Sequence, residues 1–328
     1  MSEPVLVVQN LRKKFGDFEA VRGVSFSVAR GEIFGLLGPN GAGKTTTISM
    51  ATGLYPPTEG KIRIGGVDLS EDANAAKRKV GLVPQELALY PTLSARDNLT
   101  FFGRIYGLKG KHLRDKVQSM LEMVRLADRA DEPVENYSGG MKRRVNIAAG
   151  LLHEPEILFL DEPTVGVDPQ SRNAIFESVE TLNRQGMSIV YTTHYMEEAE
   201  RLCHRVAIID TGEIIALDTP TGLIQSLGGG VIQVGLDDGS GQPLGASEQE
   251  EGGGRIAQVV EQIGALPSVK AATVTDGRLK VEANRAQEAL MGVLELTNEL
   301  DVRITMLEIL EPNLEGVFLH LTGKKLRE

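Results

Sequence analysis

The segment that decides the fold of this chain is Ile33-Phe34-Gly35-Leu36-Leu37-Gly38-Pro39-Asn40-Gly41-Ala42-Gly43-Lys44-Thr45-Thr46. A short apolar strand enters a glycine-rich turn, a helical pattern follows, and the letters match the phosphate-binding loop. Glycines let successive backbone N–H groups turn toward phosphate oxygens, and a helix N-terminus adds positive partial charge. A purely structural glycine-rich turn could fit the same letters, but the strand and helix around it favour a nucleotide site.

The residues of this loop that we expect to bind the nucleotide are Gly38, Asn40, Gly41, Ala42, Gly43, Lys44, Thr45 and Thr46. In such loops the lysine contacts the β- and γ-phosphates, and the hydroxyl that follows it ligates Mg²⁺. Lys44 and Thr45 are therefore predicted to perform these two functions.

A second apolar run, Ile157 to Leu160, ends in the adjacent carboxylates Asp161 and Glu162. Successive side chains of a strand point to opposite sides, so one carboxylate can hold a metal while its neighbour faces a water molecule. We assign Asp161 to Mg²⁺ and Glu162 to general-base catalysis. Alone, this pattern is weak evidence, because many buried strands end in acidic loops.

Charge and hydropathy limit the classes of function. The formal net charge of -10 argues against a broad electrostatic contact with nucleic acid. No apolar run reaches the roughly 18 to 20 residues that a membrane span needs, so a membrane role is expected to be peripheral. The single cysteine, Cys203, cannot form an internal disulfide, and we expect a cytoplasmic location.

Two domains are predicted along the chain. Residues 1–228 alternate β-branched runs with helical patterns, which indicates an α/β domain with buried parallel strands. Residues 229–328 follow the order strand, helix, strand, strand, helix, strand, which predicts a small α+β ferredoxin-like domain. Glycine, serine and acidic residues between 237 and 254 predict a flexible acidic loop after its first strand.

The string Tyr137-Ser138-Gly139-Gly140-Met141 lies between the two nucleotide motifs. Ser138 suits a helix N-cap, and the two glycines expose backbone donors. With this string, the chain resembles the ABC-transporter ATPase family. The resemblance implies a P-loop ABC-type nucleotide-binding domain with a helical subdomain at about 86–155, and ATP as the nucleotide. It also implies that Ser138, Gly139 and Gly140 bind the γ-phosphate held by a second ATPase subunit, most simply in a homodimer.

Four further positions match the family in order. The resemblance implies that Gln85 senses Mg²⁺ or the attacking water, that His194 contacts the γ-phosphate and helps to fix Glu162, and that Asp168 crosses the dimer interface. Phe15 stands where the family has an adenine-stacking aromatic residue, although core packing is an equal alternative. Met141 and Phe15 depart from the commoner residues at these positions.

The C-terminal string Glu311 to Leu319 is similar to that of ABC-2-type exporters, which implies export through a separate membrane permease. Residues 86–106 are a candidate permease-docking segment, with Leu99, Phe102 and Ile105 expected in the core. The C-terminal domain is interpreted as a dimerisation or regulatory module. Two alternatives remain: an ABC ATPase that acts on nucleic acid, and an importer ATPase with a ligand-sensing tail.

Overall fold

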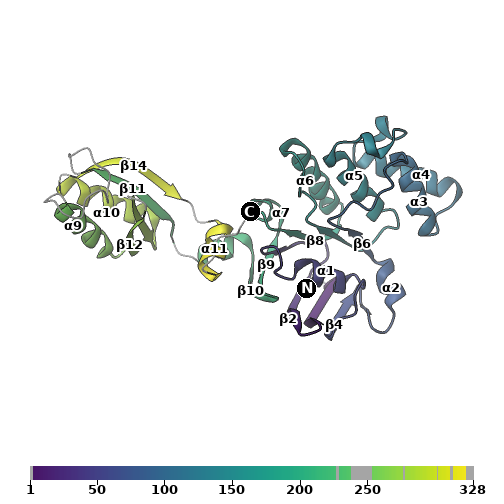
Figure 1. Ribbon diagram of the computed structural model, residues 1–328, viewed down its shortest axis with the longest axis horizontal. Coiled ribbons are helices and arrows are strands. Elements are labelled where there is room, and N and C mark those ends of the chain that lie inside the picture. Colours follow the sequence, from purple (N-terminus) through teal and green to yellow (C-terminus); the bar gives the residue numbers. More distant parts are fainter. Residues whose placement is uncertain are drawn as a thin grey trace. The chain divides into compact units, whose positions relative to one another are not determined.

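The computed structural model describes residues 3–226, 229–237, 253–275, 278–300, 302–310 and 313–322 (Figure 1). The chain divides into two compact units, and the division falls between Pro220 and Thr221. The predicted boundary at residue 228 lies outside the described residues, as does most of the predicted acidic loop. None of the helices in the described ranges is both long enough and apolar enough to cross a membrane.

A six-stranded sheet in the order β10-β9-β3-β8-β7-β6 forms the centre of the first unit. Its strands are β3 (Ile33–Leu37), β6 (Val80–Val83), β7 (Ile157–Asp161), β8 (Ser188–Thr193), β9 (Arg205–Asp210) and β10 (Glu213–Asp218). The first five are parallel, and β10 pairs antiparallel with β9. Every residue of β3, β7 and β8 is buried, as their apolar runs predict. The predicted parallel α/β sheet is confirmed.

An antiparallel sheet in the order β2-β1-β4-β5 lies beside it and was not predicted. Its strands are β1 (Leu6–Phe15), β2 (Phe18–Val28), β4 (Glu59–Ile64) and β5 (Val67–Asp68). Only one face of this sheet is apolar, so its strands lack the continuous hydrophobic runs of the central sheet. The two sheets share one core, in which the rings of Phe26 and Phe34 stack at 4.9 Å.

Helices follow the strands of the first unit: α1 (Lys44–Ala51), α2 (Ala73–Arg78), α3 (Ala95–Ile105), α4 (Gly110–Met123), α5 (Gly139–Gly150), α6 (Pro169–Arg184) and α7 (Met196–Leu202). Helices α3, α4 and α5 gather at one end of the unit, next to β6 (Figure 1). Leu99 of α3 is buried, as predicted. The core assignment of Ile105 was wrong, because it lies in the last turn of α3 and is 62% exposed.

Helix α8 (Pro220–Ser226) leads into the second unit, whose elements are β11 (Val231–Asp237), α9 (Gly253–Gly264), β12 (Val269–Thr275), β13 (Arg278–Ala283), α10 (Ala286–Glu299), β14 (Arg303–Leu310) and α11 (Leu314–Thr322). The strands pair antiparallel in the order β12-β13-β11-β14. Helices α9 and α10 pack on one face of this sheet and enclose a separate core (Figure 1). The predicted order of strands and helices is therefore observed, whereas α11 was not predicted.

Two glycines let α5 pack closely against β6. A Cβ at Gly81 of β6 would lie 2.4 Å from the carbonyl oxygen of Gly150 in α5 and 2.8 Å from Leu158 Cδ1. Neither a main-chain carbonyl nor a packed core residue can move far without disturbing the sheet. The contact fixes the helix that follows Ser138 against the central strands.

We expect Gly81→Ala to lower the free energy of unfolding by about 1–3 kcal/mol, because the added methyl overpacks this contact. Denaturant unfolding without nucleotide is the measurement. Gly139→Ala is the matched stability control, since its Cβ would meet only Gly166 O at 3.7 Å. Equal stability of the two variants would contradict the close approach.

Candidate nucleotide site

The loop between β3 and α1 is shaped for a close approach of its backbone to a ligand. A Cβ at Gly38 would lie 2.1 Å from the carbonyl oxygen of Ile209, so only glycine fits there. Gly41 and Gly43 have φ angles of 84° and 103°, in the region that favours glycine. Gly41 is exposed, and a Cβ there would meet no atom within 4 Å. The loop thus presents open backbone at the N-terminus of α1, which suits a phosphate group.

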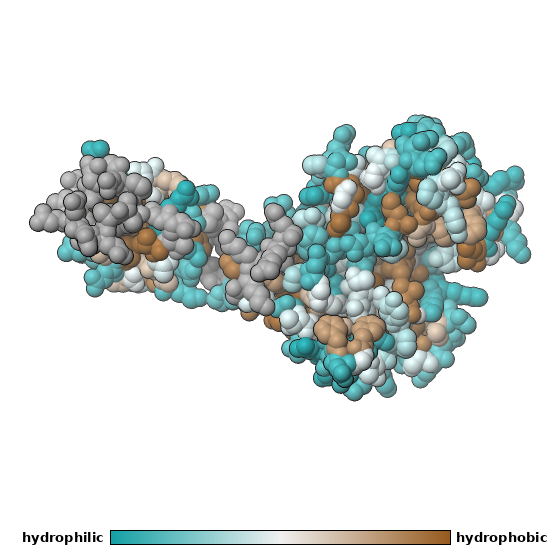
Figure 2. Space-filling model, viewed as in Figure 1, coloured by the Kyte–Doolittle hydropathy of each residue, from teal (hydrophilic) through white to brown (hydrophobic). Residues whose placement is uncertain are grey.

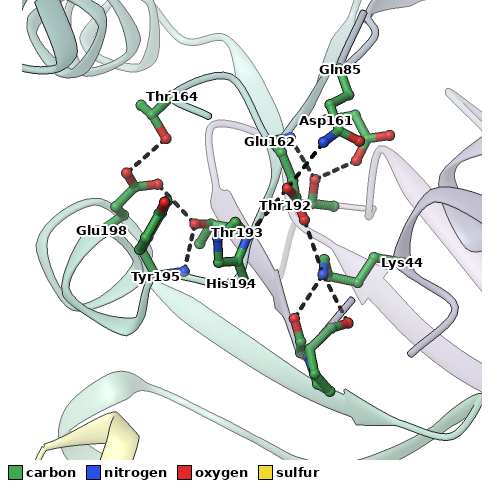
Figure 3. Close-up of polar contacts among 12 residues, drawn as sticks. Lys44, Gln85, Asp161, Glu162, Thr164, Thr192, Thr193, His194, Tyr195 and Glu198 are labelled. Atoms are coloured by element: carbon green, nitrogen blue, oxygen red, sulfur yellow. Dashed lines mark hydrogen bonds and ion pairs between the residues drawn. The ribbon is translucent and has the colours of Figure 1, made fainter. Parts of the chain in front are cut away.

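Lys44 holds its ammonium group inside this loop. Its side chain is 4% exposed, and Nζ donates to Gly38 O at 2.7 Å and to Pro39 O at 3.1 Å (Figure 3). The same nitrogen lies 3.0 Å from Glu162 Oε1. A buried ammonium needs such partners, because leaving it unpaired in a low-dielectric site is costly. The positive charge is thereby fixed within the loop whose sequence predicts phosphate binding.

Glu162 is the point where the ends of three parallel strands converge. Lys44 contacts Oε1 of this carboxylate. The other oxygen, Oε2, lies 3.2 Å from His194 Nδ1 and 3.4 Å from Gln85 Nε2 (Figure 3). Gln85 follows β6, Glu162 follows β7 and His194 follows β8, so the parallel arrangement places all three at one edge. Glu162 also adopts φ 45°, which is uncommon for a residue other than glycine. The predicted residues Gln85, Glu162 and His194 are therefore brought together around one carboxylate.

Asp161, the neighbouring carboxylate, points into a different environment. Burial raises the pKa of its carboxyl group, and hydrogen bonds from Thr192 and Thr45 oppose that shift. A nearby cation would favour the ionised form, and Mg²⁺ typically binds one or two protein carboxylates together with phosphates and water. Among the residues that the structure describes, no group of three or more His, Cys, Asp or Glu side chains could hold a metal. Asp161 and the Thr45 hydroxyl therefore fit an ion that also needs nucleotide oxygens.

Thr192 is a site residue that sequence reasoning missed. Its buried hydroxyl accepts from Glu162 N at 2.9 Å and donates to Asp161 Oδ1 at 2.6 Å. One side chain of β8 thus holds the Asp161 carboxylate and the main chain of Glu162. A threonine in a β-rich run carries no local signal of such a position, because β-propensity alone explains it.

Arg143 of α5 was also missed. Its guanidinium donates to Pro84 O at 2.9 Å and to Gln85 O at 2.8 Å, and burial lowers the pKa of Arg143. The helix that begins at Gly139 is thus tied to the main chain that carries the Gln85 side chain. A signal did exist: Arg143 shares a helical face with Gly140 and Ile147, both of which are buried.

Ser138 and Asp168 lie at the starts of two neighbouring helices. Ser138 Oγ accepts from Met141 N at 3.2 Å at the start of α5, and Asp168 Oδ1 accepts from Ser171 N at 2.9 Å at the start of α6. Gly140 packs against Ser171, since a Cβ there would lie 2.1 Å from Ser171 Cβ. Within the described ranges, neither Ser138 nor Asp168 forms a hydrogen bond or ion pair with Lys44, Glu162 or His194. The chain does not bring these predicted ligands to its own phosphate loop.

Phe15 ends β1 and is 48% exposed, so the alternative of core packing was wrong. Its ring lies 6.4 Å from the ring of Tyr55 in an edge-to-face arrangement, and Lys13 Nζ lies 5.2 Å from its centroid. An exposed aromatic face of this kind is available for stacking on a planar ring.

The fold and this site define a phosphate-loop nucleoside triphosphatase. The ABC transporter family profile matches residues 21–165. The chain is 45% identical to the linearmycin resistance ATP-binding protein LnrL of Bacillus subtilis (strain 168), over 99% of this chain and 100% of that protein. It is 39% identical to the Nod factor export ATP-binding protein I of Ralstonia nicotianae, over 100% of this chain and 96% of that protein.

Among solved structures, the dimeric post-hydrolysis state of an ATP-binding cassette with bound ADP and Pi is similar, with a TM-score of 0.59 and 27% identity. The similarity covers 65% of this chain and 98% of that one. The chain belongs to the ABC transporter family. Within it, the chain is an ATP-binding subunit of the exporter type, which hydrolyses ATP for transport.

The raised pKa of Asp161 generates a stability prediction. Because the folded state binds this proton more tightly than the unfolded chain, stability falls as pH rises through the raised pKa. We expect Asp161→Asn, which has no charge to desolvate, to raise the melting temperature of the ATP-free protein at neutral pH. The gain should shrink as the pH falls toward the ordinary value of 3.8. Thermal unfolding across pH is the measurement, and a variant less stable than wild type throughout would contradict the prediction.

Proposed function

We propose that the residues gathered around Glu162 form one half of a composite ATP site, and that the other half comes from a second ATPase subunit. The observation that carries the proposal is the convergence of Lys44, Gln85 and His194 on the Glu162 carboxylate. The roles below follow from this geometry.

The phosphate loop binds ATP through its backbone N–H groups, with the Lys44 ammonium on the β- and γ-phosphates. Asp161, Thr45 and Gln85 would hold Mg²⁺, which when bound neutralises the charge that develops on the phosphate oxygens. The Thr192 hydroxyl supports this arrangement, because it donates to Asp161 Oδ1 and thereby fixes the orientation of that carboxylate. Phe15 offers its exposed ring to the adenine.

Glu162 accepts the proton of the water that attacks the γ-phosphorus atom, and the bond from that atom to the β-γ bridging oxygen breaks. His194, at 3.2 Å from Glu162 Oε2, holds the carboxylate in place, and we also assign to it a contact with the γ-phosphate. Gln85 approaches the same oxygen from the opposite loop and can orient the water. General-base catalysis of this kind typically contributes on the order of 10²- to 10⁴-fold.

The second half of each site is assigned to Ser138, Gly139, Gly140 and Asp168. Ser138, Gly139 and Asp168 are exposed, and each of them begins or directly precedes a helix, where partial positive charge favours a phosphate. Their separation from the chain's own Lys44 and Glu162 supports use in trans. The second subunit is most simply another copy of this chain, and no nucleic acid partner is expected.

The test of the general base is Glu162→Gln, which keeps the volume and removes the basic oxygen. We expect ATP binding to persist, turnover to fall by about 10²- to 10⁴-fold, and an ATP-bound dimer to accumulate. Phosphate release, nucleotide binding and light scattering measure the three properties. Lys44→Ala is the contrasting variant, because it should lose productive phosphate positioning and the dimer together. Near wild-type hydrolysis by Glu162→Gln would refute the assignment.

The chain is further proposed to work on the cytoplasmic face of the membrane under a separate permease, and to energise export. A resistance protein and an export protein among its full-length relatives support the direction of transport. Exposed apolar side chains around α3 offer a surface for the permease (Figure 2). This docking patch consists of Leu87, Tyr90, Leu93, Phe101, Ile105 and Tyr106.

Replacing Ile105 by Asp tests the docking patch, because a charge there opposes burial against a partner. We expect loss of ATP-driven transport with the permease present and unchanged hydrolysis by the isolated chain. Leu54→Asp is the matched control, since Leu54 is 60% exposed beyond the end of α1, outside the patch. If Ile105→Asp leaves transport intact, the patch does not dock the permease.

We also assign the second unit to the ferredoxin-like arrangement and interpret it as a regulatory or dimerisation domain of residues 229–328. The antiparallel strand order β12-β13-β11-β14, with both helices on one face, supports this assignment.

A further inference from the structure

Glu198 of α7 is a buried carboxylate next to the site. Its side chain is 2% exposed, and three hydroxyl groups donate to it, of which Figure 3 shows those of Thr164 and Thr193. Thr164 Oγ1 lies 2.7 Å from Oε1, whereas Tyr191 OH and Thr193 Oγ1 each lie 2.9 Å from Oε2. Burying a carboxylate is costly unless its oxygens are satisfied, so these hydroxyls are needed to hold it there.

Two of the three donors lie next to the catalytic groups along the chain. Thr164 lies two residues after Glu162, and Thr193 immediately precedes His194. Thr193 Oγ1 also accepts from Tyr195 N at 2.9 Å, which fixes the main chain on the far side of His194 (Figure 3). The Glu198 carboxylate therefore ties together the two loops whose separation sets the 3.2 Å contact between His194 and Glu162.

Glu198 also forms an ion pair with Arg172, in the first turn of α6. Its Nε lies 3.8 Å from Glu198 Oε1, and its guanidinium lies over the ring of Tyr195 at 5.1 Å. Arg172 follows Ser171, whose N–H binds Asp168. The carboxylate thus also contacts the segment that we assign to the dimer interface.

We propose that Glu198 is a positioning residue for ATP hydrolysis, which holds the loops after β7 and β8 in the register that keeps His194 on Glu162. This inference rests on the proposed roles of Glu162 and His194. It differs from a merely structural role in one respect: loss of the carboxylate should act through His194, and should leave ATP binding intact.

The experiment compares Glu198→Gln with Glu32→Gln in the full chain. An amide has one acceptor oxygen and cannot accept from three hydroxyls, so Glu198→Gln should lower kcat by about 10- to 100-fold with little change in KM. Glu32 is an equivalent buried glutamate, 8% exposed and 2.8 Å from Arg205, and it lies away from the site. Glu32→Gln should lower stability and leave kcat unchanged.

A double-mutant cycle with His194→Ala distinguishes positioning from general damage. If Glu198 acts through His194, Glu198→Gln should change the residual rate of His194→Ala less than twofold. Additive losses, or an equal loss of kcat in Glu32→Gln, would overturn the proposal. If Glu198→Gln fails to fold, Thr193→Val removes one donor and should lower kcat in the same manner; a wild-type rate in that variant would also overturn it.

The outcome for Glu198 is separable from that of the proposed function. Wild-type hydrolysis by Glu162→Gln would refute the general base, whatever Glu198 does. Loss of turnover in Glu162→Gln with wild-type kcat in Glu198→Gln would refute the positioning role alone. In the Glu162→Gln background, Glu198→Gln should still form the ATP-bound dimer, because the carboxylate acts on hydrolysis rather than on assembly.

Discussion

The Glu162 carboxylate is the constraint on which the rest of the site depends. It is buried at the end of β7, where an uncompensated negative charge would strongly destabilise the fold. Compensation comes from Lys44 after β3, Gln85 after β6 and His194 after β8. A parallel sheet brings the carboxyl ends of these strands to one edge. The fold therefore supplies the partners that stabilise the buried Glu162 charge.

Close packing sets the remaining geometry. Gly38 presses against the main chain of β9, and Gly81 lets α5 approach β6, so the phosphate loop and the helix after Ser138 have little freedom. Arg143 then joins α5 to the carbonyl groups of Pro84 and Gln85. A displacement of α5 is therefore expected to reach Gln85 through a short, rigid connection, which offers a physical route between the helical region and the hydrolysis site.

Two of the residues proposed to bind nucleotide in trans, Ser138 and Asp168, lie at helix starts. Ser138 and Asp168 are the N-caps of α5 and α6, and their side chains accept from the main-chain N–H groups of Met141 and Ser171. Such caps stabilise the helix ends in the single chain and leave the outer surface available. On the proposed composite site, hydrolysis would be controlled by association, because the contacts between the two halves form only when two subunits meet.

The sequence by itself determined the phosphate loop, the Asp161-Glu162 pair, the parallel α/β character of the first unit and the order of strands and helices from β11 to β14. These features depend on contiguous residues, whose periodicity and turn chemistry can be read locally. It also identified Gln85 and His194, through their order in the resemblance to a family. The antiparallel sheet of β1, β2, β4 and β5 was not predicted, because half-buried strands have weaker hydrophobic patterns in the sequence than fully buried strands.

Only the tertiary structure decided which side chains surround the carboxylates. Thr192 lies 30 residues from Glu162, and the Gln85 contact spans 77 residues, so no local pattern reports them. The structure also left Ile105 exposed in the last turn of α3, although its apolar side chain had indicated the core. Burial and hydrogen bonding at such positions depend on strand order and helix packing, which bring distant segments together only when the whole chain folds.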